Sequence, residues 1–171
     1  MTEKTRERRR TPFFLKPIVS AISGRRVVQV FMKLASPIDR RLIPATNGRL
    51  SVAIGQPVLV MEVVGAKSGK KRRTPLLYLR DGENIVLVAS YGGSQHHPAW
   101  YHNVKANPRV RLFVRDGSGW YTARQAEGEE RDRLWKAAVE FYPGYGKYQT
   151  YTDRQIQLFV LTPEPGAPSE S

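Results

Sequence analysis

The sequence of 171 residues contains no cysteine and only three histidines, and its acidic side chains are few. Without cysteine, the chain has no disulfide, iron–sulfur cluster, thiolate-bound metal or cysteine nucleophile. The adjacent histidines His96 and His97 diverge and have no carboxylate nearby in the sequence. Metal ligands must converge on one ion, so we expect no metal site.

A long hydrophobic run is also absent from the N-terminal region. Arg8–Arg10 precede an apolar stretch, as in a twin-arginine export signal, but the uncharged run Pro17–Gly24 holds only eight residues. A membrane-spanning helix needs about 20 apolar residues. We therefore expect a cytoplasmic protein rather than an exported one.

Basic side chains outnumber acidic ones by 28 to 15 and are concentrated in the first half of the chain. Residues 1–50 carry 12 basic and 3 acidic side chains, residues 51–80 carry 6 and 1, and residues 81–171 carry 10 and 11. A protein that coats nucleic acid spreads its positive charge more widely. The distribution favours local contacts with anions, and we expect no nucleic-acid partner, although a basic nucleic-acid-binding module remains an alternative.

The length and the 40% apolar composition fit one folded domain. Helices are expected from Pro98 to about Asn107 and from about Glu127 to Phe141. Short apolar or alternating runs between turn residues predict strands at residues 58–64, 75–79, 84–89, 109–115, 120–125 and 155–161. Short β-hairpins with few helices favour a small antiparallel barrel.

Two flanking segments complete the predicted organisation. Residues 1–50 form a basic arm ahead of a barrel domain at residues 51–162, and residues 163–171 form a disordered tail rich in proline and serine. One face of an amphipathic helix in the arm carries four apolar residues, Val27, Val30, Phe31 and Leu34. That helix either packs on the domain or lies on an anionic membrane surface, which would make the protein peripheral to the membrane.

The first chemical motif is the basic stretch between the first two predicted strands, Gly65-Ala66-Lys67-Ser68-Gly69-Lys70-Lys71-Arg72-Arg73. It is not a Walker loop, because only three residues separate its glycines and a lysine follows Lys70. Five basic side chains in seven residues, a hydroxyl and the N–H groups of a turn suit a phosphate. A solvated hairpin tip, a nucleic-acid patch and a small-molecule phosphate site all remain consistent with this motif alone.

The second motif follows the third predicted strand, at residues 89–108. Gly92-Gly93 let a planar ligand approach the backbone, and the helix that starts at Pro98 carries Trp100 and Asn103 one turn apart. This arrangement suits a bound ring. A lone tryptophan is equally often a core residue, so the core remains the alternative role.

The third motif repeats tyrosine at every third position in Tyr142-Pro143-Gly144-Tyr145-Gly146-Lys147-Tyr148. In one loose helical turn the three side chains share a face, and their phenol groups border one pocket. Packing in the core or on the surface is the alternative role for tyrosines at this spacing.

In this order, the three motifs resemble those of the deazaflavin (coenzyme F420)-dependent nitroreductase family. The resemblance spans Gly55 to Thr162. It implies a mainly β fold with flanking helices, the FMN-binding-like split β-barrel, whose groove takes the deazaflavin ring. It also implies an F420H2-dependent oxidoreductase that transfers a hydride to a quinone, enone or nitroaromatic acceptor.

The resemblance further implies a role for each motif. The phosphate and the acidic oligoglutamate tail of the cofactor would bind to Lys67, Ser68, Gly69 and Arg72. The remaining cofactor-binding residues would be Pro75, Leu76, Ala89, Ser90, Pro98, Trp100, Tyr101 and Asn103. The acceptor would be bordered by Leu77, Ser90, Tyr142, Tyr145 and Tyr148. Tyr145 is the expected catalytic residue, either bonding the acceptor oxygen or supplying a proton.

Two other classes of function stay open: a split-barrel protein that binds FMN, haem or deazaflavin without turnover, and a basic nucleic-acid-binding module. In the enzymatic interpretation the cofactor is coenzyme F420, with FMN as the alternative, and the partner is a small-molecule acceptor. A quinone is the expected acceptor, because the basic arm would bring the barrel to the anionic membrane in which such molecules dissolve.

Overall fold

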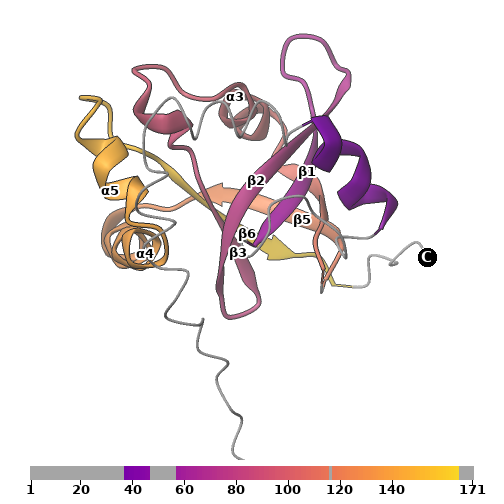
Figure 1. Cartoon of the computed structure of the whole chain (residues 1–171). Coiled ribbons are helices and arrows are strands. Elements are labelled where there is room, and N and C mark those ends of the chain that lie inside the picture. The colour runs from indigo at the N-terminus through magenta and orange to yellow at the C-terminus, as the bar shows by residue number, and fades with distance from the viewer. Residues whose placement is uncertain (1–36, 47–56, 116, 166–171) are drawn as a thin grey trace, which may run out of the picture.

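The computed structural model describes residues 37–46, 57–115 and 117–165. Six antiparallel strands close into a barrel in the order β1-β2-β3-β6-β5-β4 (Figure 1). They are β1 (Val58–Val64), β2 (Lys71–Asp81), β3 (Asn84–Val88), β4 (Arg109–Phe113), β5 (Gly119–Gln125) and β6 (Leu158–Pro163). The predicted mainly β fold with flanking helices, a split β-barrel, is confirmed.

The barrel core follows from alternation along the strands. In β1, the side chains of Leu59, Met61 and Val63 lie in the barrel core. The alternate residues Val60 and Glu62 point outward, because successive residues of a strand face opposite sides of a sheet. The same alternation in the other strands fills the interior with aliphatic and aromatic side chains, whose burial is the main stabilising contribution.

One helix covers an end of the barrel and two others cover its wall. Helix α3 (Ala99–Ala106) buries Trp100 and Val104 in the barrel core. Helices α4 (Gly128–Phe141) and α5 (Gly144–Gln149) pack on the outer face of β3 and β6. Figure 1 shows these two helices side by side, and Arg133 of α4 forms an ion pair with Asp81 at the turn that joins β2 to β3.

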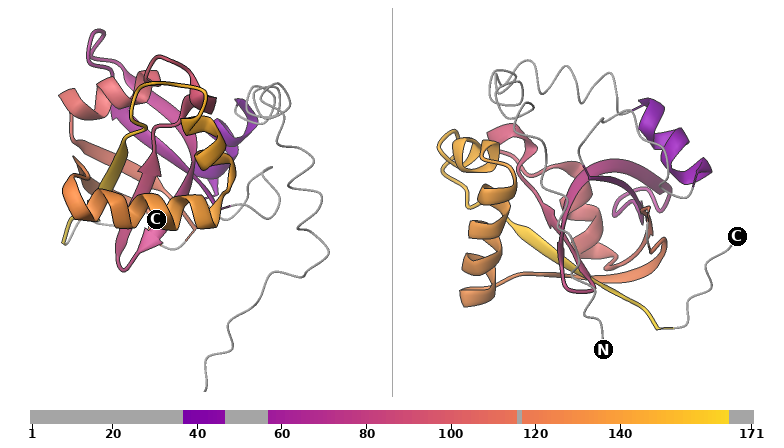
Figure 2. Two further views of the ribbon diagram at one scale, coloured as in Figure 1. Left: turned by 90° about the vertical axis from the view of Figure 1, so that its left-hand side faces the viewer. Right: turned by 60° about the horizontal axis from the view of Figure 1, so that its bottom comes forward.

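A fourth helix, at residues 37–45, lies on the opposite side of the barrel from α4 and α5 (Figure 2). Its Ile43 is fully buried and packs against Val60 and Phe113 on the outside of β1 and β4. The sequence interpretation expected amphipathic helices within residues 1–50 but did not place one at residues 37–45, although Ser36-Pro37 is a pattern typical of a helix start.

The structure corrects several predicted boundaries. β2 begins at Lys71 rather than Pro75, so three residues of the basic motif are strand residues. β6 begins at Leu158 and includes Pro163, and the backbone N–H of Glu164 donates to the carbonyl of Trp120. The loose tail therefore cannot begin at residue 163. The predicted amphipathic helix from Val27 lies outside the described residues.

No helix in the three described segments is long and apolar enough to cross a membrane.

Candidate cofactor and acceptor site

The cationic turn, residues 65–70, joins β1 to β2 and is closed by its own backbone. Gly65 N–H donates to the carbonyl of Lys70 at 2.9 Å, and Gly69 N–H donates to the carbonyl of Gly65 at 2.8 Å. Gly69 has a φ of 65°, a left-handed conformation that glycine adopts without steric cost. Lys67, Ser68 and Gly69 are exposed. The turn therefore presents a hydroxyl and lysine side chains to the solvent.

Two of the five basic side chains of the motif form ion pairs with a carboxylate of the protein. Glu62 on β1 is only 7% exposed and lies 2.8 Å from Arg73 Nε and 3.5 Å from Lys71 Nζ. Burial alone would raise the pKa of the Glu62 carboxyl, but the hydrogen bond and charges of Arg73 and Lys71 hold that pKa below its usual value. Strand alternation puts Arg72 on the other side of β2.

Lys67, Lys70 and Arg72 form no ion pair within the described part of the chain. They are the cations of the motif that are available to an anionic ligand. Two of these three, Lys67 and Arg72, are residues predicted to bind the cofactor.

Side-chain amides tie the cationic turn to α3. Ala66 N–H donates to Asn103 Oδ1 at 3.0 Å, and Asn107 Nδ2 donates to the carbonyl of Val64 at 3.1 Å. The basic motif and the tryptophan-bearing helix are therefore neighbours, although they are far apart in the sequence. Asn103 Oδ1 already accepts a bond from the turn, which makes Asn103 a support for the turn's conformation.

Four of the predicted cofactor-binding residues are largely buried. Ala89 is 0% exposed, Trp100 5% and Tyr101 9%, and all three belong to the barrel core. The Trp100 ring packs edge to face on Phe159, and Pro98 is buried at the start of α3. In this conformation their side chains pack inside the protein. Their contact with a cofactor stays a prediction.

The outer strip of β2, defined by Pro75 and Leu77, is half-buried. Pro75 pairs with the outward-facing Val60, so both side chains of the strip point out of the barrel. Leu76, predicted to line the same site, instead packs against the barrel core. Further along the strand, Leu79 packs in the cluster under α4 and α5. The strip therefore lies between the faces covered by helix 37–45 and by α4 and α5.

The tyrosine cluster consists of Tyr142, Tyr145 and Tyr148, which the end of α4 and helix α5 bring together. Tyr142 and Tyr145 rings meet at 5.1 Å between centroids, and the Tyr142 and Tyr148 hydroxyls are 3.2 Å apart. Tyr145 and Tyr148 are each 4% exposed, whereas Tyr142 is half-buried. Burial raises the pKa of the Tyr145 and Tyr148 phenols, so both remain protonated at neutral pH.

Glycine at position 93 serves packing between protein segments, not the approach of a ligand. A Cβ there would lie 2.6 Å from the carbonyl oxygen of Tyr148 and 2.8 Å from Tyr151 Cβ. The space beside Gly93 is filled by the end of α5, so the prediction that it admits a planar ligand is wrong. The absence of a side chain brings the tyrosine segment close to Ser90, which is 9% exposed.

The sequence interpretation missed Arg154, whose guanidinium binds the carbonyls of Ala89, Ser90 and Ser94. No local pattern marks this residue, because its partners are about 60 positions away in the chain. No group of three or more metal-ligating side chains occurs within residues 37–46, 57–115 and 117–165.

The family model of the F420H(2)-dependent quinone reductases matches residues 38–163. The chain belongs to this family. F420H(2)-dependent quinone reductase Rv1261c from Mycobacterium tuberculosis is 40% identical to it in an alignment of 122 residues that covers 68% of this chain and 82% of that protein.

Two solved structures resemble this member of the F420H(2)-dependent quinone reductase family at 49% identity. The F420-H2-dependent reductase FDR-A superposes with a TM-score of 0.57 and covers 61% of this chain and 93% of its own. A structure described as a domain-swapped dimer gives a TM-score of 0.58 and covers 61% and 79%.

Membership of the F420H(2)-dependent quinone reductase family implies coenzyme F420 as the cofactor, and the residues present fit that molecule. The anionic tail requires accessible cations, which Lys67, Lys70 and Arg72 provide. A flat ring requires an apolar seat that is not fully covered, and the half-buried Pro75 and Leu77 provide one. Both features belong to β2 and the turn before it, and strand alternation puts Arg72 on the opposite face of β2 from Pro75 and Leu77.

Proposed function

We propose that the protein transfers a hydride from reduced F420 to a quinone, with the site spread over the cationic turn, the outer strip and the tyrosine cluster. The observation that carries this proposal is the order of these features: cations lead along β2 to half-buried apolar residues and then toward a group of phenols. The polyanionic tail of the cofactor requires cations, its flat ring requires an apolar seat, and the carbonyl group of the acceptor requires hydrogen-bond donors. The protein presents these groups in this order.

The cofactor, when bound, supplies the hydride chemistry itself. Lys67, Lys70 and Arg72 hold the anionic tail by charge and hydrogen bonds. Pro75 and Leu77 orient the ring and exclude water from one of its faces. The half-buried Tyr142 then lies closest to solvent in the tyrosine cluster, and its hydroxyl is paired with that of Tyr148.

The tyrosine cluster holds protons that can balance a hydride delivered to a quinone carbonyl. Tyr142 can donate a hydrogen bond to the acceptor oxygen while Tyr148 bonds to Tyr142. Tyr145, predicted to be catalytic, is 4% exposed and reaches an acceptor only when the cluster opens. Ser90 and Leu77 complete the proposed border of the acceptor pocket.

The decisive experiment is the anaerobic oxidation of purified F420H2 by the protein with menadione as acceptor. Loss of F420H2 and formation of the quinol in equal amounts are expected, and FMN should not replace F420. A protein that binds F420 or FMN tightly without oxidising it would instead be a non-catalytic carrier. Enone and nitroaromatic acceptors tested in the same assay define how selective the pocket is.

We further propose that the basic arm brings the enzyme to anionic membranes that contain its acceptor. The 12 basic and 3 acidic side chains of residues 1–50 support this location, since each basic residue near an anionic surface contributes about 1 kcal/mol. Flotation with anionic liposomes is expected to carry the full chain but not a variant lacking residues 1–36. Flotation of that variant would contradict the proposal.

A further inference from the structure

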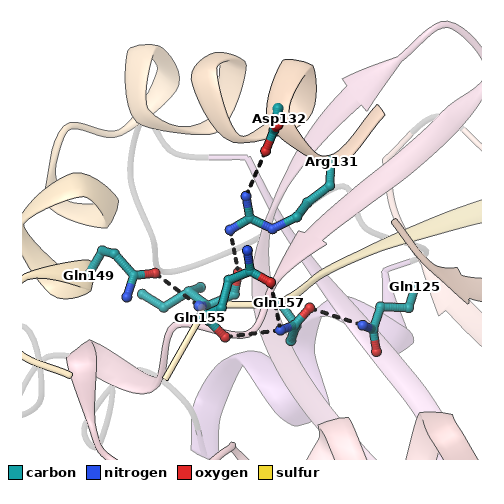
Figure 3. A network of polar contacts seen from close by, with 7 residues as sticks. Gln125, Arg131, Asp132, Gln149, Gln155 and Gln157 are labelled. Atoms are coloured by element: carbon teal, nitrogen blue, oxygen red, sulfur yellow. Dashed lines mark hydrogen bonds and ion pairs between the residues drawn. The ribbon is translucent and has the colours of Figure 1, made fainter. Parts of the chain in front are cut away.

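The connection between α5 and β6 is held firmly in place by glutamine side chains. Gln149 Nε2 donates to the carbonyl of Arg154 at 2.8 Å, and Gln149 Oε1 accepts from the backbone N–H of Ile156 at 2.9 Å. Figure 3 shows Gln149 beside Gln155 and Gln157 in this network. Gln157 in turn accepts a hydrogen bond from Gln125 of β5 at 3.0 Å. The backbone around Arg154 is therefore fixed on both sides, by α5 and by the barrel wall.

From this fixed segment the Arg154 side chain reaches the Ser90 loop, defined as residues 89–97. Its guanidinium donates to the carbonyl oxygens of Ser94 at 2.8 Å, Ala89 at 3.1 Å and Ser90 at 2.8 Å. Arg154 Nη1 also lies 3.3 Å from His97 Nδ1. A planar guanidinium suits this task, because its fork of N–H groups can bind several oxygens at once.

The Ser90 loop needs such an external hold, because its backbone is strained. Tyr91 has a φ of 48°, and the following glycines have φ values of 62° and 75°. A left-handed conformation costs a residue with a side chain roughly 1–2 kcal/mol. A strained loop of this kind persists only where surrounding contacts determine its shape, and Arg154 makes the largest set of these contacts.

Burial of the Arg154 guanidinium is by itself unfavourable. It is half-buried, burial lowers its pKa, and it forms no ion pair in the described segments. Removing a guanidinium from water without a carboxylate partner is unfavourable. Hydrogen bonds to three carbonyls offset that cost. Replacing Arg154 would remove its bonds to the carbonyls of Ala89 and Ser94 and leave the Ser90 carbonyl with the Gly93 N–H.

We propose that Arg154 is a positioning residue for the acceptor pocket: it locks Ser90 at a set distance from the tyrosine cluster by clamping the Ser90 loop to the end of α5. This inference rests on the proposed function. A second contact supports the same clamp, since Thr152 Oγ1 donates to Gln95 Oε1 at 2.9 Å. The cationic turn is on the other side of α3 from this clamp, so cofactor affinity and acceptor turnover should respond differently.

The first test compares Arg154→Gln with the wild type in F420 titrations and in F420H2–menadione kinetics. We expect kcat/KM for menadione to fall about tenfold while the F420 dissociation constant changes by less than about threefold. Arg133→Gln is the matched control, because Arg133 forms a surface pair with Asp81 and touches neither the loop nor the cluster. This control should behave like the wild type.

A double-mutant cycle with Ser90→Ala tests whether Arg154 acts through Ser90. If it does, Arg154→Gln should reduce kcat/KM by much less in the Ser90→Ala background than in the wild type. Full additivity of the two effects would overturn the proposal, because residues that act independently show additive effects.

Chemical rescue separates positioning from simple loss of folding. Guanidinium ion at sub-denaturing concentration should restore part of the menadione turnover of Arg154→Ala, whereas sodium ion at equal strength should not. A variant that is merely less stable would lose further activity in guanidinium. Wild-type turnover in variants of Arg154, or equal loss of F420 binding and turnover, would overturn this inference alone. A wild type that reduces no acceptor would overturn the proposed function and this inference with it.

Discussion

The cationic turn and the tyrosine cluster, for which we propose binding of the cofactor tail and of the acceptor, are built in two different ways. The turn is exposed, and its conformation needs only short backbone bonds and the side chain of Asn103. The cluster is mostly buried, and its position depends on Gly93, Arg154 and the packing of α5. A charged tail can be held by flexible cations in water, whereas an acceptor must be placed to within a fraction of an ångström for hydride transfer.

The largest expected effect is a loss of F420 affinity when positive charge is removed from the cationic turn and the start of β2. Lys67→Ala combined with Arg72→Ala should weaken F420 binding by roughly 100-fold, since each lost charged hydrogen bond contributes on the order of 1.5–3 kcal/mol. Fluorescence titration measures the affinity. The melting temperature should not change, because neither side chain forms an ion pair in the described chain.

A control for that variant uses a cation that the protein itself neutralises. Lys71→Ala should affect F420 affinity far less, because Lys71 lies 3.5 Å from Glu62. Equal losses of affinity from Lys71→Ala and from the double variant would show that the tail binds the whole basic motif without selection.

The second-largest effect is a loss of stability when the packing beside the tyrosine cluster is altered. Gly93→Ala would place a methyl group 2.6 Å from the Tyr148 carbonyl, and we expect a destabilisation of about 2–4 kcal/mol in urea unfolding. Gly69→Ala is the matched control: its φ of +65° is similar, and nothing lies within 4 Å of the new Cβ. It should cost only about 1 kcal/mol. Similar costs at both positions would contradict the packing role of Gly93.

A smaller effect is expected from single hydroxyls of the tyrosine cluster. Tyr142→Phe removes the half-buried phenol oxygen that bonds Tyr148 and should lower kcat/KM for menadione about tenfold. Tyr145→Phe removes a buried hydroxyl and should change kcat/KM less than about threefold unless the cluster opens during turnover. A larger loss for Tyr145→Phe would support the original prediction of Tyr145 as the catalytic residue.

The smallest effect concerns pH and the carboxylate beneath the basic motif. The pKa of Glu62 is lowered in the folded protein, so the unfolded chain takes up its proton first as the pH falls. The stabilisation from Glu62 is fully present above its ordinary pKa of 4.5 and is lost as the pH falls through the lowered value. Thermal unfolding of Glu62→Gln should therefore depend less on pH below 5 than that of the wild type.

Glu83→Gln provides the control for this pH dependence, because Glu83 is exposed in the turn between β2 and β3. Its unfolding curve should follow that of the wild type at each pH. If Glu62→Gln also followed the wild type, Arg73 and Lys71 would not be stabilising the carboxylate.

Several elements could be predicted because their signals are local. Short apolar runs next to turn residues identified β1 and β3, alternation identified β4, and Pro98 and Asn107-Pro108 bounded α3 to within one residue. The basic motif and the tyrosine repeat were also visible, since both consist of neighbours in the chain. The strand conformation of Lys71 to Arg73 could not be predicted from the sequence, because these residues form a strand only by pairing with β1 around the buried Glu62.

The sequence by itself determined the strand pattern, the concentration of charge at one turn and the close spacing of Tyr142, Tyr145 and Tyr148. Only the tertiary structure decided which side chains remain accessible, that Trp100 and Ala89 lie in the core, and that Arg154 binds the Ser90 loop. The physical reason is range: alternation and turn chemistry act between near neighbours, whereas burial and the contacts of Arg154 exist only after the barrel has closed.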